Sequence, residues 1–156
     1  MINLNVKIEG LRELKSDIDK FTREVGSLDS PLKEAGKYME EQAVMNFSRK
    51  GSLMQTGGWS PLKQSTKDYK AKSFPNKGMM IRTSNLKNSF DSSRTGAGKL
   101  KVFNPLDYAS YHQEGTINLP MRILLKFEKQ QVSDITKIMH NWVEKTLNKN
   151  FTKTFI

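Results

Sequence analysis

Residues 30–47 read SPLKEAGKYMEEQAVMNF. Ser30 followed by Pro31 favours the start of a helix, because serine caps the first free amides and proline suits the first helical position. Apolar or small residues then recur at Leu32, Gly36, Met39, Ala43 and Phe47. This spacing is typical of a helix that is buried along one side. We therefore expect a helix here whose small residues allow another backbone to come close.

Two further elements are predicted upstream of this helix. Residues 2–8, INLNVKI, alternate apolar and polar side chains, as in a strand that is buried on one face. Apolar residues then recur with helical spacing at Leu11, Leu14, Ile18, Phe21 and Val25, before Gly26. The pattern predicts a strand followed by a helix over residues 11–25.

Downstream, the periodicity disappears from residue 48 to about residue 80. Glycines and prolines interrupt this segment, and only residues 65–71 resemble a short helix. The segment contains Lys50, Lys63, Lys67, Lys70, Lys72 and Lys77 but one acidic residue, Asp68. A loop of this length is uncommon inside a compact domain and is usually functional or mobile. We expect a mobile basic loop over residues 48–80.

The rest of the chain adds a hairpin and more helices. Residues 81–90 indicate a turn of helix that leads into a strand, and residues 89–104 a hairpin around Gly96 and Gly98. Residues 106–114 and 131–148 are expected to be helical, and residues 120–127 extended. Taken together, these predicted helices and strands indicate an α+β fold in a single domain over residues 1–156. Its small, mainly antiparallel sheet combines the first strand, the hairpin and the stretch near residue 122, and is covered by two N-terminal helices and one C-terminal helix.

The charge of the chain is concentrated in its middle third. The formal net charge is +10, and residues 50–105 hold eleven Lys/Arg against two Asp/Glu, a net of +9. Residues 1–49 have a net charge of −1 and residues 106–156 a net charge of +2. The middle third is therefore expected to face an acidic surface.

Composition excludes several classes of protein. The sequence has no cysteine, which rules out disulfides, thiolate metal sites and cysteine nucleophiles. No apolar run approaches the ~20 residues that span a bilayer, and no signal peptide is recognisable. We expect a protein that is made in the cytoplasm and has no membrane partner.

The candidates for catalysis are few. His112, flanked by Asp107 and Glu114, is a conceivable base or metal site, and His140 is the only other histidine. No HExxH, Gly-x-Ser-x-Gly or nucleotide-binding glycine motif accompanies them. A histidine beside tyrosines is more commonly a hydrogen-bonded packing residue. We expect no enzyme activity and no cofactor.

A nucleic-acid-binding module is the alternative. Lysines interleaved with Trp59, Tyr69 and Phe74 could follow phosphates and stack on bases. The segment has no zinc-finger, helix-turn-helix or RNP signature. Solvated lysines on a flexible loop are the commoner explanation of such a composition.

Three short motifs occur in a fixed order in the second half. They are Trp59-Ser60-Pro61-Leu62, then Ile81-Arg82-Thr83-Ser84-Asn85-Leu86, then Tyr108-Ala109-Ser110-Tyr111-His112-Gln113-Glu114-Gly115 with Pro120-Met121-Arg122 after it. Their order resembles the phage virion morphogenesis family, the tail-completion proteins of Mu-like and related phages. The similarity covers roughly residues 36–148, and Ser84 stands where the family usually has glycine.

The resemblance implies a structural subunit of a tailed phage or prophage, located at the tail end or neck of the virion. Tail completion or head–tail joining, through a ring of identical subunits, is the implied function. The implied partners are further copies of the chain, the tail tube, and tail-terminator or connector proteins, with possible DNA contact in the channel. A ring needs two unlike patches on each subunit, and the near-neutral N-terminal helices and the basic centre provide them.

Two sets of site residues follow. The candidate interface residues are Lys63, Lys67, Lys70, Lys72, Lys77, Arg82 and Arg122. The motif residues expected to serve packing are Trp59, Pro61, Leu62, Leu86, Tyr108, His112, Gln113 and Gly115. Tyr108, Tyr111 and His112 share one helix face by their spacing, and we expect that face to pack against the sheet.

Overall fold

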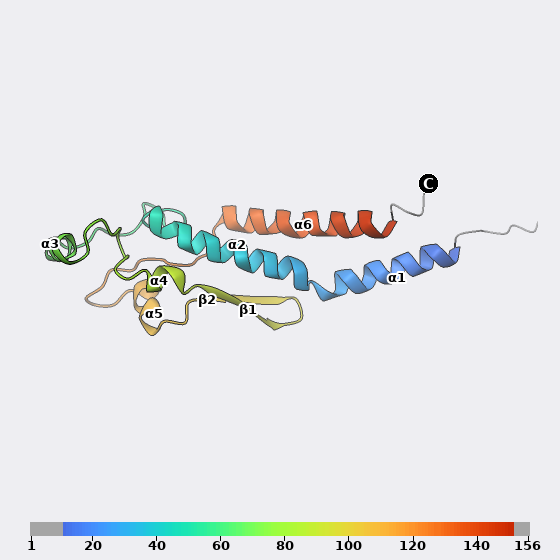
Figure 1. Cartoon of the computed structure of the whole chain (residues 1–156), viewed down its shortest axis with the longest axis horizontal. Coiled ribbons are helices and arrows are strands. Elements are labelled where there is room, and N and C mark those ends of the chain that lie inside the picture. The colour runs from blue at the N-terminus through green and yellow to red at the C-terminus, as the bar shows by residue number, and fades with distance from the viewer. Residues whose placement is uncertain (1–10, 152–156) are drawn as a thin grey trace, which may run out of the picture.

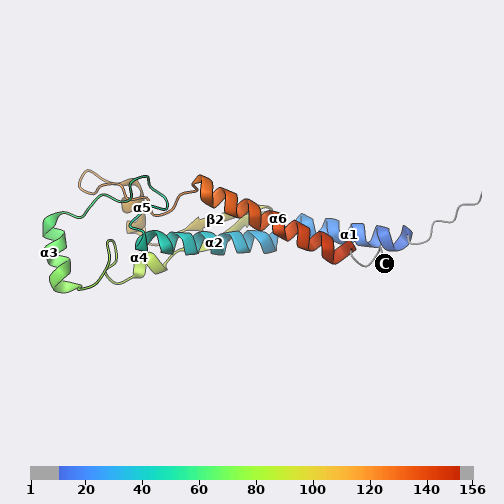
Figure 2. The ribbon, with the colours of Figure 1, turned by 90° about the horizontal axis from the view of Figure 1, so that it is seen from above.

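The computed structural model of the protein describes residues 11–151. The elements are α1 (Leu11–Ser27), α2 (Asp29–Ser48), α3 (Gln64–Ser73), α4 (Asn85–Asn88), β1 (Asp91–Gly96), β2 (Lys99–Phe103), α5 (Asp107–Glu114) and α6 (Lys129–Phe151). The predicted α+β class is confirmed. The strand predicted over residues 2–8 lies outside the described residues. The molecule is elongated, because α1 and α2 follow one another lengthwise and α6 runs beside both (Figures 1 and 2).

Helix α2 is the central element. It packs against α6 on one side and against the β1–β2 hairpin on the other (Figure 1). Ala35, Met39 and Ala43 are at most 2% exposed. A Cβ atom at Gly36 would lie 2.5 Å from the Ser92 Oγ of β1 and 3.3 Å from a Leu100 methyl of β2. The close approach expected at the small residues of this helix is therefore the contact with the hairpin.

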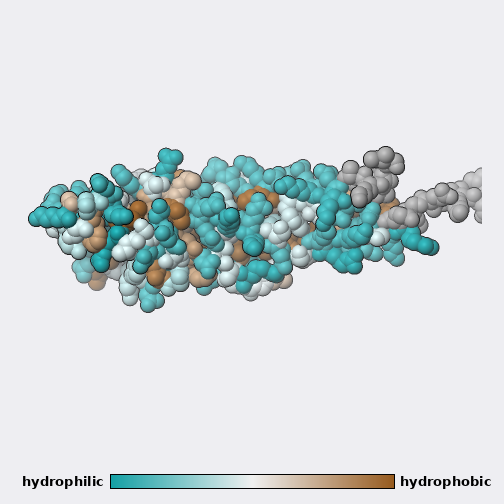
Figure 3. All heavy atoms as spheres, viewed as in Figure 1, coloured by the Kyte–Doolittle hydropathy of each residue, from teal (hydrophilic) through white to brown (hydrophobic). Residues whose placement is uncertain are grey.

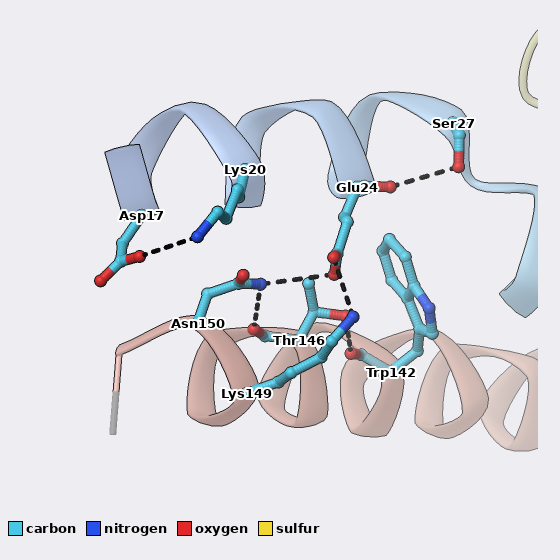
Figure 4. Close-up of polar contacts among 8 residues, drawn as sticks. All are labelled: Asp17, Lys20, Glu24, Ser27, Trp142, Thr146, Lys149 and Asn150. Carbon is cyan, nitrogen blue, oxygen red and sulfur yellow. Dashed lines mark hydrogen bonds and ion pairs between the residues drawn. The ribbon is translucent and has the colours of Figure 1, made fainter. Parts of the chain in front are cut away.

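The contact between α1 and α6 combines an aromatic pair with a polar cluster. The rings of Phe21 and Phe151 meet edge to face, with centroids 5.7 Å apart. Glu24 accepts hydrogen bonds from Lys149 Nζ at 2.9 Å and from Asn150 Nδ2 at 3.3 Å (Figure 4). The bonds from Lys149 and Asn150 lower the pKa of Glu24.

A second polar contact joins α6 to α2. The Tyr38 hydroxyl donates to Asp134 Oδ2 at 2.8 Å, and burial together with this carboxylate raises the pKa of Tyr38 to about 12. Asp134 also accepts from Gln130 and Lys137, and these bonds lower the pKa of Asp134 to about 2. The carboxylate thus stays charged and keeps the two helices in register.

Among residues 11–151, the sheet is smaller than the sequence predicts. Within the described residues it holds two antiparallel strands, in which Ser92 pairs with Val102 and Arg94 with Leu100. The extended stretch near residue 122 does not join it, because side chains from other elements bond its backbone groups. Helix α2 packs on the hairpin, whereas α6 packs on α1 and α2. The prediction of one sheet covered by three helices was wrong in these respects.

The core lies where the C-terminal end of α2 meets the irregular segments. Its buried residues are Phe47, Trp59, Leu86, Ala109 and Leu124. The Trp59 indole meets the Phe47 ring edge to face, with centroids 5.1 Å apart. It lies over Gly51, whose φ is +87° and where a Cβ would collide with the indole. Residues 49–59 contain turns and no helix or strand, and the Trp59 contacts attach this loop to the body.

The prediction for α5 needs a correction as well. Tyr108 is 42% exposed and Tyr111 is 56% exposed, so this helix face does not pack against the sheet. Helix α5 instead turns Ala109 towards the core. Alanine allows the helix to come close, and this proximity brings the Gln113 amide within reach of the backbone after residue 122.

Candidate functional site

Residues 123–126 are an extended segment whose backbone is bonded by side chains. The side-chain oxygen of Gln113, Oε1, accepts hydrogen bonds from the backbone amides of Leu124 and Leu125 at 2.8 and 3.1 Å. Its Nε2 donates to the Leu125 carbonyl at 2.9 Å. The Ile123 carbonyl accepts from Trp59 Nε1 at 2.8 Å. These bonds replace a strand partner, because buried peptide groups need one partner or another.

Two further polar residues, which the sequence analysis missed, complete this arrangement. Asn46 is fully buried on α2 and donates to the Ile123 carbonyl at 3.1 Å. Gln55 Oε1 accepts from the Ile123 amide at 3.0 Å. Asn46 carries a recognisable signal, since a polar residue beside Phe47 interrupts the apolar side of a helix. Gln55 carries none, because it lies in a segment without periodicity.

A pocket of about 840 Å³ lies beside this segment, and Arg122, the residue before it, is one of the lining residues. The pocket lies between α3, residues 80–86, α5 and residues 118–122. Its apolar wall is formed by Leu62, Tyr69, Phe74, Met80, Ile81 and Leu119. Figure 3 shows apolar surface over the half of the molecule that holds α3, α4 and α5, whereas the α1–α6 end is mainly hydrophilic on that face.

Four of the predicted interface cations line this pocket: Lys63, Lys70, Arg82 and Arg122. None of its described lining residues is acidic. We call this site, with its apolar wall and its four cations, the basic pocket.

Lys70 and Arg82 also hold the pocket wall in place. Lys70 Nζ donates to the carbonyls of Gly78 at 2.8 Å and Ile81 at 2.6 Å, and burial lowers the Lys70 pKa. The Arg82 guanidinium lies 5.3 Å from the centroid of the Phe74 ring, a cation–π contact. Each cation therefore has a local role in addition to its charge.

Ser84 forms the turn of the pocket wall that precedes α4. Its φ is +70°, in the left-handed region that glycine adopts without strain. The amide of Asn88 bonds its carbonyl at 2.9 Å, which closes the turn at the start of α4. Glycine, which is usual at this position in the family that the motifs resemble, adopts this backbone conformation readily.

Arg122 is the most buried of the cations, at 4% exposed. Its Nε and Nη2 both donate to the Ser60 carbonyl at 3.3 Å. No carboxylate in residues 11–151 forms an ion pair with it. A guanidinium has five N–H donors in a planar fork that matches a carboxylate, so donors remain for an anion in the pocket.

His112 contacts Arg122 through its backbone, whereas Ser60 contacts the Arg122 side chain. The His112 carbonyl accepts from the Arg122 amide at 2.7 Å. Its Nδ1 is buried and has no hydrogen-bond partner among the described residues. Burial and, secondarily, the charge of Arg122 lower the pKa of His112, which favours the neutral imidazole.

The other predicted site residues are spread around the site. Lys67, Lys70 and Lys77 line a shallower pocket of about 380 Å³ on α3, and Lys72 lines neither pocket. Leu62, Leu86 and Tyr108 line the basic pocket, whereas Pro61 is exposed. Gly115 has a φ of +77°, and a Cβ there would lie 2.9 Å from the Met121 amide. Its conformation ends α5 and turns the chain back.

The described residues contain no group of three or more histidines and acidic residues placed to hold a metal ion. None of the described helices has the length and apolar character needed to cross a membrane. What the site offers is a set of positive donors over an apolar wall, which is chemistry suited to binding.

The family model for phage virion morphogenesis proteins matches residues 10–144, most of the chain. The chain belongs to the phage virion morphogenesis family. No curated protein and no solved structure matches it. The family is a structural and assembly family, so this virion morphogenesis protein acts in building the phage particle. The match includes the basic pocket and the segment bonded by Gln113.

Proposed function

We propose that this virion morphogenesis protein is a tail-completion or head–tail joining subunit, located at the tail end or neck of the virion. It works by assembling with further copies of itself, as a ring, and with neighbouring tail-tube, tail-terminator or connector proteins. Family membership supports a role in assembly, and the basic pocket supports a binding mechanism.

The observation that carries the proposal is the state of Arg122 in the basic pocket. Among residues 11–151, this guanidinium is 4% exposed and bonds a single backbone carbonyl, so it has lost most of its water without gaining a carboxylate there. Burial of a charge without a partner is costly. An acidic group from another chain would offset this cost, and the apolar wall would add buried area to the contact.

The position of the basic pocket also suits an assembly with unlike contacts. The pocket and the lysines of α3 lie at one end of the long axis, and α1 with the end of α6 lies at the other (Figure 1). Each subunit can therefore present different surfaces to different neighbours, as a ring or stacked joint requires.

The decisive experiment uses phage or induced prophage that lacks the protein. Electron micrographs of the lysates should show heads and tails that are not joined, or tails of abnormal length. Supplying the wild-type protein should restore particles, and the double variant Arg82→Glu/Arg122→Gln should restore fewer. Normal particles in the complete absence of the protein would contradict the proposed function.

A DNA-binding role in the phage channel is the second candidate. The observation that favours it is α3, which has no buried residue and carries Lys67, Lys70 and Lys72. Duplex affinity that falls steeply with salt, and that is lost in Lys67→Glu/Lys72→Glu, would support it. Lys70 is left unchanged, because its bonds to Gly78 and Ile81 hold the pocket wall. Salt-independent or absent DNA binding would leave protein–protein assembly as the remaining function.

A further inference from the structure

A short loop beside the basic pocket exposes an isoleucine completely. Residues 116–119 connect α5 to the segment bonded by Gln113, and Ile117 is fully exposed at their tip. Met121 and Tyr111, close in sequence, are 49% and 56% exposed. Single apolar residues on a surface need no explanation, but contiguous exposed apolar patches mark interaction sites.

The loop has a defined shape of its own. The Thr116 amide donates to the Leu119 carbonyl at 2.8 Å, and the Leu119 amide donates back to the Thr116 carbonyl at 3.2 Å. The Thr116 hydroxyl also accepts from the amides of Asn118 and Leu119. A loop already held in shape loses little conformational freedom on binding. Ile117 is thus presented on a preformed tip, which we call the Ile117 loop (residues 116–119).

The stretch of sequence that leads into and includes the Ile117 loop contains acidic residues and no lysine or arginine before Arg122 of the basic pocket. Residues 102–121 contain Asp107 and Glu114 and no lysine or arginine. Neither acid forms an ion pair within residues 11–151. The basic pocket has four cations and no acidic lining residue among the described residues. One chain therefore carries an apolar tip that is close in sequence to Glu114 and an apolar pocket bordered by cations.

We propose that the Ile117 loop of one copy enters the basic pocket of the next copy. The inference rests on the proposed assembly function and names the contact that builds it. Ile117 would meet the apolar wall, and Glu114 would approach Arg82 and Lys63. The partner is a second copy because both complementary halves belong to this chain.

The geometry gives each copy one tip and one pocket. Asn118 and Leu119 line the basic pocket of their own subunit, whereas Ile117 does not. The tip and the pocket thus lie on different sides of the same loop. Such a contact is heterologous, and it repeats from copy to copy until a ring closes.

Site-specific cross-linking tests this contact directly. The natural chain has no cysteine, so Ile117→Cys and Thr83→Cys introduce two defined thiols, one on the tip and one in the pocket wall. With a short bis-maleimide, the double variant should give a ladder of covalent oligomers. An equimolar mixture of the two single variants should give a cross-linked dimer and no larger species.

A matched pair supplies the control. Ile117→Cys/Ser133→Cys has the same tip thiol, with the second thiol on the exposed surface of α6, and should not give the ladder. Because Ile117 and Thr83 are exposed, neither substitution is expected to prevent folding, which circular dichroism checks. If the pocket thiol gives no more cross-linking than the α6 thiol, the inference is wrong.

Charged variants add a second, independent readout. Ile117→Asp destroys the tip and Arg82→Glu damages the pocket, and each variant alone should sediment as a monomer at concentrations where the wild type self-associates. Their mixture should form a one-to-one dimer, because one intact tip and one intact pocket remain. A wild type that stays monomeric at every concentration would overturn the inference.

Failure of the tip-to-pocket contact can be distinguished from failure of the proposed function. Should phage particles require the protein while no tip-to-pocket cross-link forms, the assembly role stands and its contact lies elsewhere. Should particles form normally without the protein, the assembly role itself falls.

Discussion

At the scale of single residues, Gln113 explains why one extended segment folds without a strand beside it. A side-chain amide carries a donor and an acceptor in the geometry of a peptide group. Gln113 uses both against the backbone of Leu124 and Leu125. Helix α5 therefore positions Arg122 through hydrogen bonds as well as through packing.

Replacement of Gln113 tests this role. Gln113→Leu leaves three backbone groups without partners, and we expect a loss of about 2–4 kcal/mol in the free energy of unfolding, measured with urea. Gln113→Glu keeps both acceptor bonds and removes the donor, so its loss should be smaller. Ser110→Ala, on the exposed side of α5, is the matched control. Equal, small losses in all three variants would show that the amide is not needed.

His112 gives the protein a pH dependence. Its folded-state pKa is lowered, by burial and then by Arg122, so the unfolded chain binds a proton more readily than the folded chain. The free energy of unfolding is therefore larger at neutral pH. It decreases as the pH falls through ~6.5, the pKa of histidine in the unfolded chain.

The corresponding experiment compares stability at pH 7.5 and pH 5.5. The decrease seen in the wild type should be smaller in His112→Gln, because the titrating group is gone. His140→Gln is the matched control, since His140 is exposed on α6 and pairs with Glu144. If both variants keep the full decrease, other groups cause the pH dependence.

Only part of what these residues do could be predicted from the sequence. Trp59, Gln113 and Arg122 could be singled out from the sequence, because they belong to the motifs whose order resembles the family. The role of Gln113 depends on contact with residues more than ten positions away, which no local pattern encodes. Tyr108 and His112 were assigned to a packing face by spacing, but spacing cannot say which of two helix faces is covered.

At the scale of elements, helices were predicted well because their signal is local. The stripe of α2 and the short helix α3 appear within a few residues of the predicted limits. The stretch near residue 122 was placed wrongly in the sheet. An extended apolar run looks the same whether a strand or a set of side chains bonds its backbone, so a sequence pattern cannot distinguish the two.

Two helical glycines give a test at this scale. Gly36 touches Ser92 and Leu100 of the hairpin, whereas a Cβ at Gly26 of α1 would meet nothing within 4 Å. We expect Gly36→Ala to destabilise the protein by about 1–3 kcal/mol, because the hairpin must move away from α2. Gly26→Ala should stabilise it by about 0.5–1 kcal/mol, because alanine is the better helix former.

Thermal unfolding of the two glycine variants decides the matter. Opposite shifts in Tm are expected from the same chemical change. If Gly36→Ala also raises Tm, the hairpin is not held against α2 in solution as the structure has it.

The two ends of the elongated molecule are held together by different contacts. The core and the basic pocket lie together at the end that holds α3, α4 and α5. The other end is α1 packed on α6, held by Phe21, Phe151 and the polar cluster at Glu24. A helix with few apolar contacts opens more easily than a core element. We therefore expect α1 to open locally while the pocket end stays folded.

Hydrogen exchange measures this difference. Amides of α1 and of the last turns of α6 should exchange by local opening, and amides of α2 around Met39 only on global unfolding. Glu24→Lys faces Lys149 with a like charge and should speed exchange in α1 severalfold while leaving α2 unchanged. Asp19→Lys makes the same change in charge at an exposed position of α1 outside the cluster, and should have less effect. The Ile117 loop and the basic pocket lie at the other end of the molecule. Cross-linking between the thiols of Ile117→Cys and Thr83→Cys should therefore persist when Glu24→Lys is added. If Glu24→Lys also speeds hydrogen exchange in α2, both ends unfold as one unit.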